Sequence, residues 1–551
     1  MTPRESPATF WRELGAVLVL SAALTVLFLY PVASNIGGVG RVDKADGQWS
    51  IWVVSWVART IVVDPRHLFD ANIFYPHRGT LAYSENNLGA GLLAVPVYWA
   101  TRNPYAAHNF VVLLAFMLSA IGTFYLVRYL IGDRRAAAIS AICFAFCPFV
   151  FAHLAHIQLE LTAGLPFTML AFHRLADRPS TGRGVALGAG MAAQALCCGY
   201  YGVFAILLVG YAVFVVAAMR SLWGNRTYWS AIAVAALVAI VLVVPAFLPY
   251  VALQRTTGFH RPLDASRGFS ASLSAYLASS SFAHVWMLRF LRPWGEVVFP
   301  GFIATGFGVA GLWLGRGIRR GETVVLYGGA TVLAFWASFG PAAGLYTVLY
   351  KAVPVFSWMR APERFGLVVD LGLSVLAGVG LTVIFERRRR PDLAAAVVTA
   401  VVVAELIVPF SWPKVPAVEP VYPVLALQPP GPVIEMPFYY REVGLFRHAQ
   451  YMLKSTTHWM PMVNGYSDYI PPDFLANVRA IAAFPSDDSL RILAPYHVRY
   501  AVFHMNHYSA RNRPDVVARL NRFSSYLRPL YVDETLRLYE IVDVPAIAPV
   551  P

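Results

Sequence analysis

The residues best suited to chemistry lie in one short stretch, Gly37–Trp56, which reads GGVGRVDKADGQWSIWVVSW. It follows the first apolar segment and carries two carboxylates, Asp43 and Asp46, in a glycine-rich setting. A positioned carboxylate can take a proton from an attacking hydroxyl group. Glycines let such a loop fold closely around a substrate. The competing interpretation is that both acids are solvated loop residues, since two acids three positions apart are common.

Three other polar clusters follow apolar segments in a similar way. They are His153 with His156, Gln158 and Glu160; Gln254 and Arg255 with His260, Arg261 and Arg267; and Trp358, Arg360, Glu363 and Arg364. Arginine binds phosphate through paired hydrogen bonds, so these clusters suit a phosphate-bearing substrate. The alternatives are polar residues at a membrane surface, arginines on lipid headgroups, or an ion pair with Glu363. Two histidines three apart are weak evidence for a metal site.

The composition indicates the environment in which these clusters act. The chain is 58% hydrophobic and 13% charged, and a soluble domain carries roughly twice that charge. Repeated apolar runs long enough to cross a bilayer predict a polytopic α-helical membrane protein. Many arginines fall between apolar runs, where positive charge sets the orientation of membrane helices. The net charge of +14 is explained in this way. We therefore expect no nucleic-acid partner.

Apolar periodicity predicts about eleven transmembrane helices. Their approximate ranges are 14–30, 106–131, 136–152, 159–175, 184–201, 202–219, 230–251, 297–314, 323–339, 365–385 and 393–410. The segment Ser50–Val63 is tryptophan-rich but short, which favours a helix lying in the membrane interface. Leu88–Trp99 is also short and contains Pro96, so we interpret it as interfacial or re-entrant.

The arginine clusters fall in alternate loops, which the positive-inside rule places in the cytoplasm. This predicts a cytoplasmic N-terminus and a large first outer loop at 34–105. All four polar clusters then lie on the outer face, and so does the rest of the chain after Ser411. The four cysteines all fall within apolar segments. We expect no disulfide framework in the C-terminal region.

The C-terminal part differs in composition from the rest. Residues 1–412 form the predicted transmembrane domain, and residues 413–551 contain more charge and proline. Short β-like runs at 432–437, 498–504 and 536–541, with a helical pattern at 515–527, predict a small soluble α/β domain. The fold class predicted is therefore a polytopic membrane protein with a C-terminal extracytoplasmic α/β domain.

With these features, the chain resembles the GT-C superfamily of integral membrane glycosyltransferases. The likeness rests on the acidic motif D-K-A-D at Asp43–Asp46 in the first outer loop, the short helices of that loop, the many spans and the outer C-terminal domain. Members use polyprenyl-phosphate sugars as donors, and an acid of the first loop acts as base or binds a metal. The spacing here is D-x-x-D rather than D-x-D. No W-W-D-Y-G sequence occurs, which argues against an oligosaccharyltransferase.

The resemblance implies roles for individual residues. Asp43 is the expected base, and Asp46 assists it or binds a divalent metal. Arg360 and Arg364 would neutralise the phosphate leaving group. The remaining substrate-binding candidates are His156, which would orient donor or acceptor, Glu160 and Arg255.

The resulting hypothesis is a glycosyltransferase of the bacterial inner membrane. It would move a sugar from a polyprenyl-phosphate donor to a hydroxyl acceptor on a glycan, lipid or protein, at the outer face and among membrane lipids. One alternative is a transporter or flippase for a lipid-linked glycan, which would need acids deep within helices and an inverted repeat. The other is a non-catalytic assembly factor, in which the acids would be dispensable.

Overall fold

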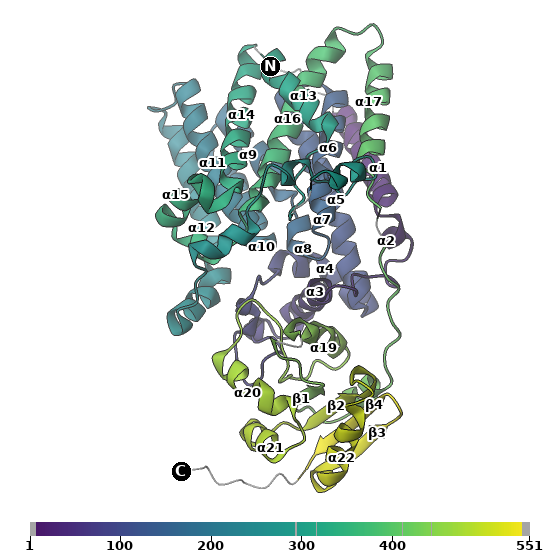
Figure 1. Ribbon diagram of the computed structural model, residues 1–551. Helices are drawn as coiled ribbons and strands as arrows, with labels where there is room; N and C mark the ends of the chain where they lie inside the picture. The colour runs from purple at the N-terminus through teal and green to yellow at the C-terminus, as the bar shows by residue number, and fades with distance from the viewer. Residues whose placement is uncertain (1–6, 292–294, 316, 410, 442–443, 543–551) are drawn as a thin grey trace. The chain divides into compact units, whose positions relative to one another are not determined.

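The protein is described from a computed structural model that covers residues 7–291, 295–315, 317–409, 411–441 and 444–542 (Figure 1). The chain divides into two compact units. The helical unit comprises Met1–Asn35, Asn109–Leu248 and Thr257–Ser411. The mixed unit comprises Ile36–His108, Pro249–Thr256 and Trp412–Pro551. The first loop and the C-terminal region, far apart in sequence, thus belong to the same compact unit.

The helical unit is built from helices of very different length. They are α1 Pro7–Phe28, α2 Tyr30–Ser34, α5 Pro104–Ile131, α6 Arg134–Ala145, α7 Pro148–Ala152, α8 Ile157–Glu160, α9 Gly164–Asp177, α10 Thr181–Cys197, α11 Gly199–Met219, α12 Arg226–Thr257, α13 Phe302–Leu314, α14 Ile318–Ser338, α15 Leu345–Ala352, α16 Gly366–Glu386 and α17 Pro391–Leu406. The first residues of α5 and the last turns of α12 belong to the mixed unit.

Six helices of the described residues are long and apolar enough to cross a membrane. They are Ala8–Phe28, Pro104–Ile131, Arg134–Ala152, Gly199–Met219, Arg226–Thr257 and Pro362–Glu386. Every apolar segment predicted from the sequence contains a helix. The larger number of crossings expected from the sequence stays a prediction, because several of these helices are shorter than a bilayer requires.

Close backbone contacts hold α16 at the centre of the helical unit. This helix packs against α13, α14 and α6 (Figure 1), and nearly all of its residues are buried. A side chain added at Gly311 of α13 would collide with the carbonyl oxygen of Leu376 in α16. Apolar side chains gain little from leaving lipid for protein, so membrane helices associate through small residues that permit such contact.

The mixed unit contains the sheet and the helices around it. Its helices are α3 Ala45–Val63, α4 Leu88–Thr101, α18 Val421–Ala426, α19 His448–Lys454, α20 Pro472–Ala482, α21 Asp487–Leu493 and α22 Arg513–Arg522. The strands β1 Val433–Met436, β2 Tyr500–His504, β3 Leu527–Val532 and β4 Leu536–Ile541 form a sheet in the order β1-β2-β4-β3. The β1–β2 pair is parallel and the other two pairs are antiparallel.

Three strands appear where the sequence predicts them, but β3 does not. The predicted runs at 432–437, 498–504 and 536–541 contain β1, β2 and β4. The helical pattern predicted at 515–527 is α22, which ends earlier, at Arg522. The following residues form β3, whose register slips between Pro529 and Tyr531. Pro529 disfavours a strand prediction because proline lacks a backbone donor, and it is tolerated here at the edge of the sheet.

The tryptophans of the first loop differ from the sequence-based expectation. The sequence predicts that the tryptophan-rich segment Ser50–Val63 is a helix lying in the membrane interface. In the structure Trp49, Trp52 and Trp56 of α3 are 8%, 1% and 6% exposed and share a hydrophobic core with strand residues such as Ile434 and Phe503. The physical reason is that indole has a large apolar area, which is buried equally well by protein side chains. Here those side chains come from a distant part of the sequence.

Segments of the first loop also join the C-terminal part through hydrogen bonds. The indole Nε1 of Trp52 donates to Asn72 Oδ1 at 3.1 Å. The Asn72 amide donates in turn to Ser455 Oγ and to the carbonyl of Met460, both at 3.1 Å. These bonds are buried, so breaking one leaves a polar group without its partner inside the core.

A buried histidine in this unit is neutral and has a hydrogen-bond partner at each ring nitrogen. His448 Nε2 lies 2.8 Å from the carbonyl oxygen of Tyr439, so this nitrogen donates. The amide nitrogen of Asn464 lies 3.0 Å from His448 Nδ1, so that nitrogen accepts. Burial lowers the pKa of His448 to about 4. Burial likewise lowers the pKa of His504 to about 3.

We therefore expect the buried neutral His448 to contribute a loss of melting temperature in the purified full chain as the pH falls from 6.5 to 4, whereas Glu435, whose pKa burial raises to about 8, acts in the opposite direction. Over that range His448 binds a proton in the unfolded chain but not in the folded chain, so its contribution to stability is lost toward acid. For His448 alone, a pKa near 4 instead of 6.5 corresponds to roughly 3 kcal/mol. The measurement is thermal unfolding in detergent across this pH range.

His448→Gln should flatten that pH dependence, because one buried group no longer titrates. His67→Gln is the matched control, since His67 is exposed and pairs with Asp64 at 2.9 Å. An equal pH dependence in His448→Gln and His67→Gln would contradict this account of His448.

Candidate functional site

Asp43 lines a cavity of about 330 Å³ within the mixed unit. It stands in the turn before α3, and its carboxylate lies 3.5 Å from Arg41 Nε. From the first loop, Ala45 and Gln48 also line this Asp43 cavity. From the C-terminal region the lining residues are Tyr439, Phe446, Arg447, Gln450 and His507. A loop acid and a set of C-terminal polar side chains thus face one space.

Close backbone contact shapes the turn that carries Asp43. Gln48 of α3 reaches back and donates from Nε2 to the carbonyl of Val42 at 2.6 Å. A side chain at Gly47 would collide with the carbonyl of Arg41, so only glycine allows the helix to start this close to the turn. The turn is therefore fixed by its neighbours on both sides of Asp43, and it differs from a mobile solvated loop.

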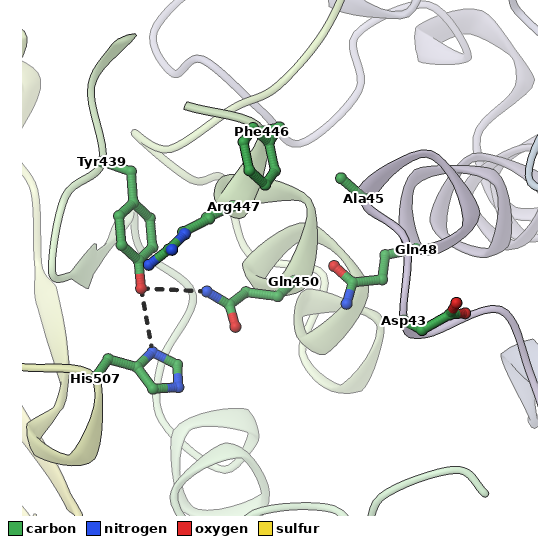
Figure 2. Close-up of a pocket in the computed structure, with 8 residues that line it drawn as sticks. All are labelled: Asp43, Ala45, Gln48, Tyr439, Phe446, Arg447, Gln450 and His507. Atoms are coloured by element: carbon green, nitrogen blue, oxygen red, sulfur yellow. Dashed lines mark hydrogen bonds between the residues drawn. The ribbon is translucent and has the colours of Figure 1, made fainter. Parts of the chain in front are cut away.

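Figure 2 shows the far wall of the Asp43 cavity as a hydrogen-bonded group. The Tyr439 hydroxyl lies 3.4 Å from His507 Nδ1 and accepts from the amide of Gln450 at 3.4 Å. The Arg447 guanidinium lies over the Tyr439 ring at 5.6 Å. In this view Gln48 lies between that group and Asp43. The cavity thus offers a carboxylate on one side and a cation with hydrogen-bonding groups on the other.

Burial sets the protonation state of His507. It lowers the pKa of His507 to about 4, and the neighbouring His504 and Lys454 act in the same direction. The rings of His504 and His507 stack with centroids 4.9 Å apart. At neutral pH His507 is therefore an uncharged group that can accept or donate one hydrogen bond.

Asp46 is placed differently from Asp43. It lies in the first turn of α3, and Tyr466 donates its hydroxyl to Asp46 Oδ1 at 3.2 Å. It does not line the Asp43 cavity. Asp46 is therefore bonded to Tyr466 outside the lining of the cavity, whereas Asp43 faces the space itself.

Asp46 is also the residue proposed for a metal. Within the part of the chain that the structure describes, no three His, Cys, Asp or Glu residues gather in a way that could hold a metal ion. A metal at Asp46 stays a prediction, and no step below depends on one.

The arginine candidates Arg360 and Arg364 share a neighbour in the helical unit. The backbone N–H of Arg360 donates to the Tyr200 hydroxyl at 2.8 Å, and the Arg364 guanidinium lies over the Tyr200 ring at 4.2 Å. The Arg360 guanidinium lies 4.9 Å from the centroid of the Phe269 ring. Arg364 Nε is 3.9 Å from Glu363, at the margin of an ion pair. The structure thus brings these two arginines together.

The histidine cluster lies within electrostatic reach of Arg364. Burial lowers the pKa of His153 to about 3, and the charges of Arg364 and His156 add to that effect. His156 directly precedes α8, which ends at Glu160. Glu160 is 1% exposed and lies inside the helical unit. His156, Glu160, Arg360 and Arg364 therefore belong to the helical unit, whereas Asp43 and Asp46 belong to the mixed unit.

Arg255 is an exposed residue near the end of α12. It belongs to the mixed unit and does not line the Asp43 cavity. The sequence-based reasoning missed four polar residues that do: Tyr439, Arg447, Gln450 and His507. One signal for three of them was present, namely the aromatic, arginine and histidine density of 438–451, FYYREVGLFRHAQY.

Comparison with solved structures identifies the fold. The chain superposes on arabinofuranosyltransferase AftD from Mycobacteria with a TM-score of 0.57 at 16% identity, over 96% of this chain. It superposes on ArnT from Cupriavidus metallidurans with a TM-score of 0.51 at 16% identity, over 97% of this chain and 98% of that protein. Both are GT-C glycosyltransferases. This chain has the GT-C fold.

That result confirms the resemblance stated from the sequence at the level of the fold. This chain spans 40% of the length of AftD, so it matches only a part of that protein. With ArnT the match extends over nearly the whole of both chains. No protein-family model matches this sequence, and no curated protein sequence matches it significantly.

Proposed function

We propose that this chain is a membrane glycosyltransferase that moves a sugar from a polyprenyl-phosphate donor to a hydroxyl acceptor. The observation that carries the proposal is Asp43, an acid of the first loop that faces a polar cavity in a chain with the GT-C fold. The proposed place is the outer face of the bacterial inner membrane, with the N-terminus in the cytoplasm. A transporter or assembly role is not favoured by any of these observations.

The proposed reaction has one bond-making and one bond-breaking event. The acceptor oxygen attacks the anomeric carbon of the sugar, and the bond from that carbon to the phosphate oxygen breaks. The proton of the acceptor hydroxyl passes to the Asp43 carboxylate, and polyprenyl phosphate leaves as an anion. A base positioned in this way accounts for about 10²–10⁴-fold of the rate.

Cations must stabilise the leaving phosphate in this proposal. Arg447 is the cation that the Asp43 cavity itself contains. Arg360 and Arg364 are the candidates of the helical unit, and their stacking on Phe269 and Tyr200 limits the directions in which their N–H groups point. A guanidinium held in this way loses less side-chain entropy when it binds phosphate.

The proposal is tested by comparing two arginine variants in a reconstituted transfer assay. We expect Arg360→Ala to lower sugar transfer from a polyprenyl-phosphate donor by roughly 10–100-fold, because a charge-assisted hydrogen bond contributes about 1.5–3 kcal/mol. The assay uses purified protein in liposomes at equal protein amounts, with radiolabelled sugar on the donor.

Arg320→Ala is the matched control, because Arg320 Nη1 already pairs with Glu386 at 3.2 Å. It should retain transfer close to the wild-type level. Equal losses in Arg360→Ala and Arg320→Ala would make Arg360 an ordinary lipid anchor. No transfer by the wild-type chain with any polyprenyl-phosphate sugar would overturn the proposed function itself.

A further inference from the structure

A second cavity, of about 610 Å³, lies within the mixed unit and shares no residue with the Asp43 cavity. One part of its wall comes from α3, α4 and the start of α5, and includes Arg59, Tyr98 and Arg102. The other part comes from the C-terminal region and includes Lys454 and Trp459. Cavities of this size commonly accommodate a small molecule or a few sugar units.

The charge of this second cavity is unbalanced. It contains three cationic side chains, Arg59, Arg102 and Lys454, and one carboxylate, Glu419. Lys454 Nζ lies 2.8 Å from Glu419 Oε1, so these two charges neutralise each other. Neither Arg59 nor Arg102 forms an ion pair with any carboxylate in the described part of the chain. Two guanidinium charges are thus left to face the cavity.

Aromatic rings hold both guanidinium groups in place. Arg59 lies over the Trp459 ring at 5.5 Å, and Arg102 lies over the Trp99 ring at 3.7 Å. Burial raises the pKa of the Tyr98 phenol, and the nearby charges of Arg59 and Arg102 oppose that rise. Both arginines therefore lie close to this side chain. Stacking uses the face of a guanidinium and leaves its N–H edge available. An edge of this kind binds the oxygens of a phosphate or carboxylate.

The rest of the wall suits a carbohydrate. Tyr98, Tyr105 and the hydroxyl-bearing Thr457 line it together with apolar residues such as Pro104, Val415 and Leu453. Such side chains combine apolar area with a hydrogen-bonding tip, and a sugar ring likewise has apolar faces and a polar edge. A lining that combines apolar area with phenol, hydroxyl and charged groups fits a sugar ring that carries an anionic group.

From this geometry we propose that the second cavity binds an anionic saccharide, a sugar unit that carries a phosphate or carboxylate group. Arg59 and Arg102 bind the anionic group, and the tyrosine and threonine side chains contact the sugar. The inference goes beyond the transfer reaction, because this site lies outside the Asp43 cavity and needs no catalysis. It gives the chain a place to hold part of a charged glycan.

The test is direct binding to the purified full chain in detergent, measured by isothermal titration calorimetry. The probes are glucose 6-phosphate, glucuronate, glucose and inorganic phosphate. We expect glucose 6-phosphate and glucuronate to bind at least roughly tenfold more tightly than glucose or inorganic phosphate. We expect Arg59→Gln and Arg102→Gln each to weaken that binding by about tenfold, at an unchanged melting temperature.

Arg66→Gln is the matched control, because Arg66 is an exposed arginine of the same unit outside this cavity. It should bind like the wild type. Asp43→Asn should also bind like the wild type, which separates this site from the proposed transfer reaction. Equal binding of inorganic phosphate and glucose 6-phosphate would overturn the saccharide assignment. Competition by phosphatidylglycerol nanodiscs, but not by phosphatidylcholine nanodiscs, would make the site a lipid headgroup site.

Discussion

Asp43→Asn should lower sugar transfer by about 10²–10⁴-fold while the protein stays folded in the membrane. Asparagine keeps the shape of the side chain and removes the base. The Asp43 carboxylate is 40% exposed and lies 3.5 Å from Arg41 Nε, so the substitution weakens that ion pair but leaves the side-chain volume unchanged. The measurement is initial rate of transfer in liposomes from a polyprenyl-phosphate sugar, at equal amounts of folded protein.

Asp46→Asn is expected to have a smaller effect than Asp43→Asn. Asp46 accepts the Tyr466 hydroxyl and does not line the cavity, so its loss displaces the start of α3 without removing the base. Asp64→Asn is the control for a carboxylate of the same unit, since Asp64 is exposed and pairs with His67. Loss of transfer in Asp46→Asn alone would make Asp46 the base. Full activity in both variants, at normal membrane levels, would end the enzymatic interpretation.

The sequence predicted the helical elements well because membrane helices have a strong local signal. An apolar run of sufficient length defines a helix without any knowledge of its neighbours. The same reasoning kept Leu88–Trp99 from being assigned as a span, and the structure shows a helix of 14 residues, Leu88–Thr101. At 1.5 Å per residue, such a helix is roughly 21 Å long and shorter than the hydrocarbon core.

The sequence predicted the first-loop residue of the candidate site but not its C-terminal residues, because long-range packing brings the two regions together. Asp43 was found from its local setting of glycines and acids. His507 and Arg447 face the same cavity from hundreds of residues further along the chain, and no local period connects them to the first loop. Glu405 shows the same limit: it lies 3.0 Å from His284 inside the protein, and no local pattern in the sequence connects these two residues.

The tryptophans of α3 show how one residue type supports two structures. A run of tryptophans after a span is typical of a membrane interface, where indole meets headgroups. The same run of tryptophans is compatible with a buried position in a protein core. Such a core needs apolar side chains from other parts of the chain, and these are known only from the fold. Here those partners include Ile434 and Phe503 of the sheet, and Asn72 takes the indole hydrogen bond of Trp52.

Trp52→Ala should therefore destabilise the protein by about 3–5 kcal/mol, the usual cost of removing a buried large aromatic side chain. The loss has two sources: a cavity in the core shared with the sheet, and an Asn72 carbonyl oxygen left without its donor. The measurement is thermal unfolding of the purified full chain together with limited proteolysis after Arg441 and Arg447. Both cleavages should become faster, because the C-terminal region is packed on the same core.

Two further variants separate core packing from anchoring at a membrane surface. Trp52→Phe keeps most of the apolar volume and should lose only the hydrogen bond, about 1–3 kcal/mol. Trp286→Ala removes an indole that is 53% exposed, and it should leave both the melting temperature and the cleavage rates near those of the wild type. If Trp52→Ala behaved like Trp286→Ala, the tryptophan face of α3 would be a surface anchor. Residues 36–108 would then contribute little to the folding of the C-terminal region.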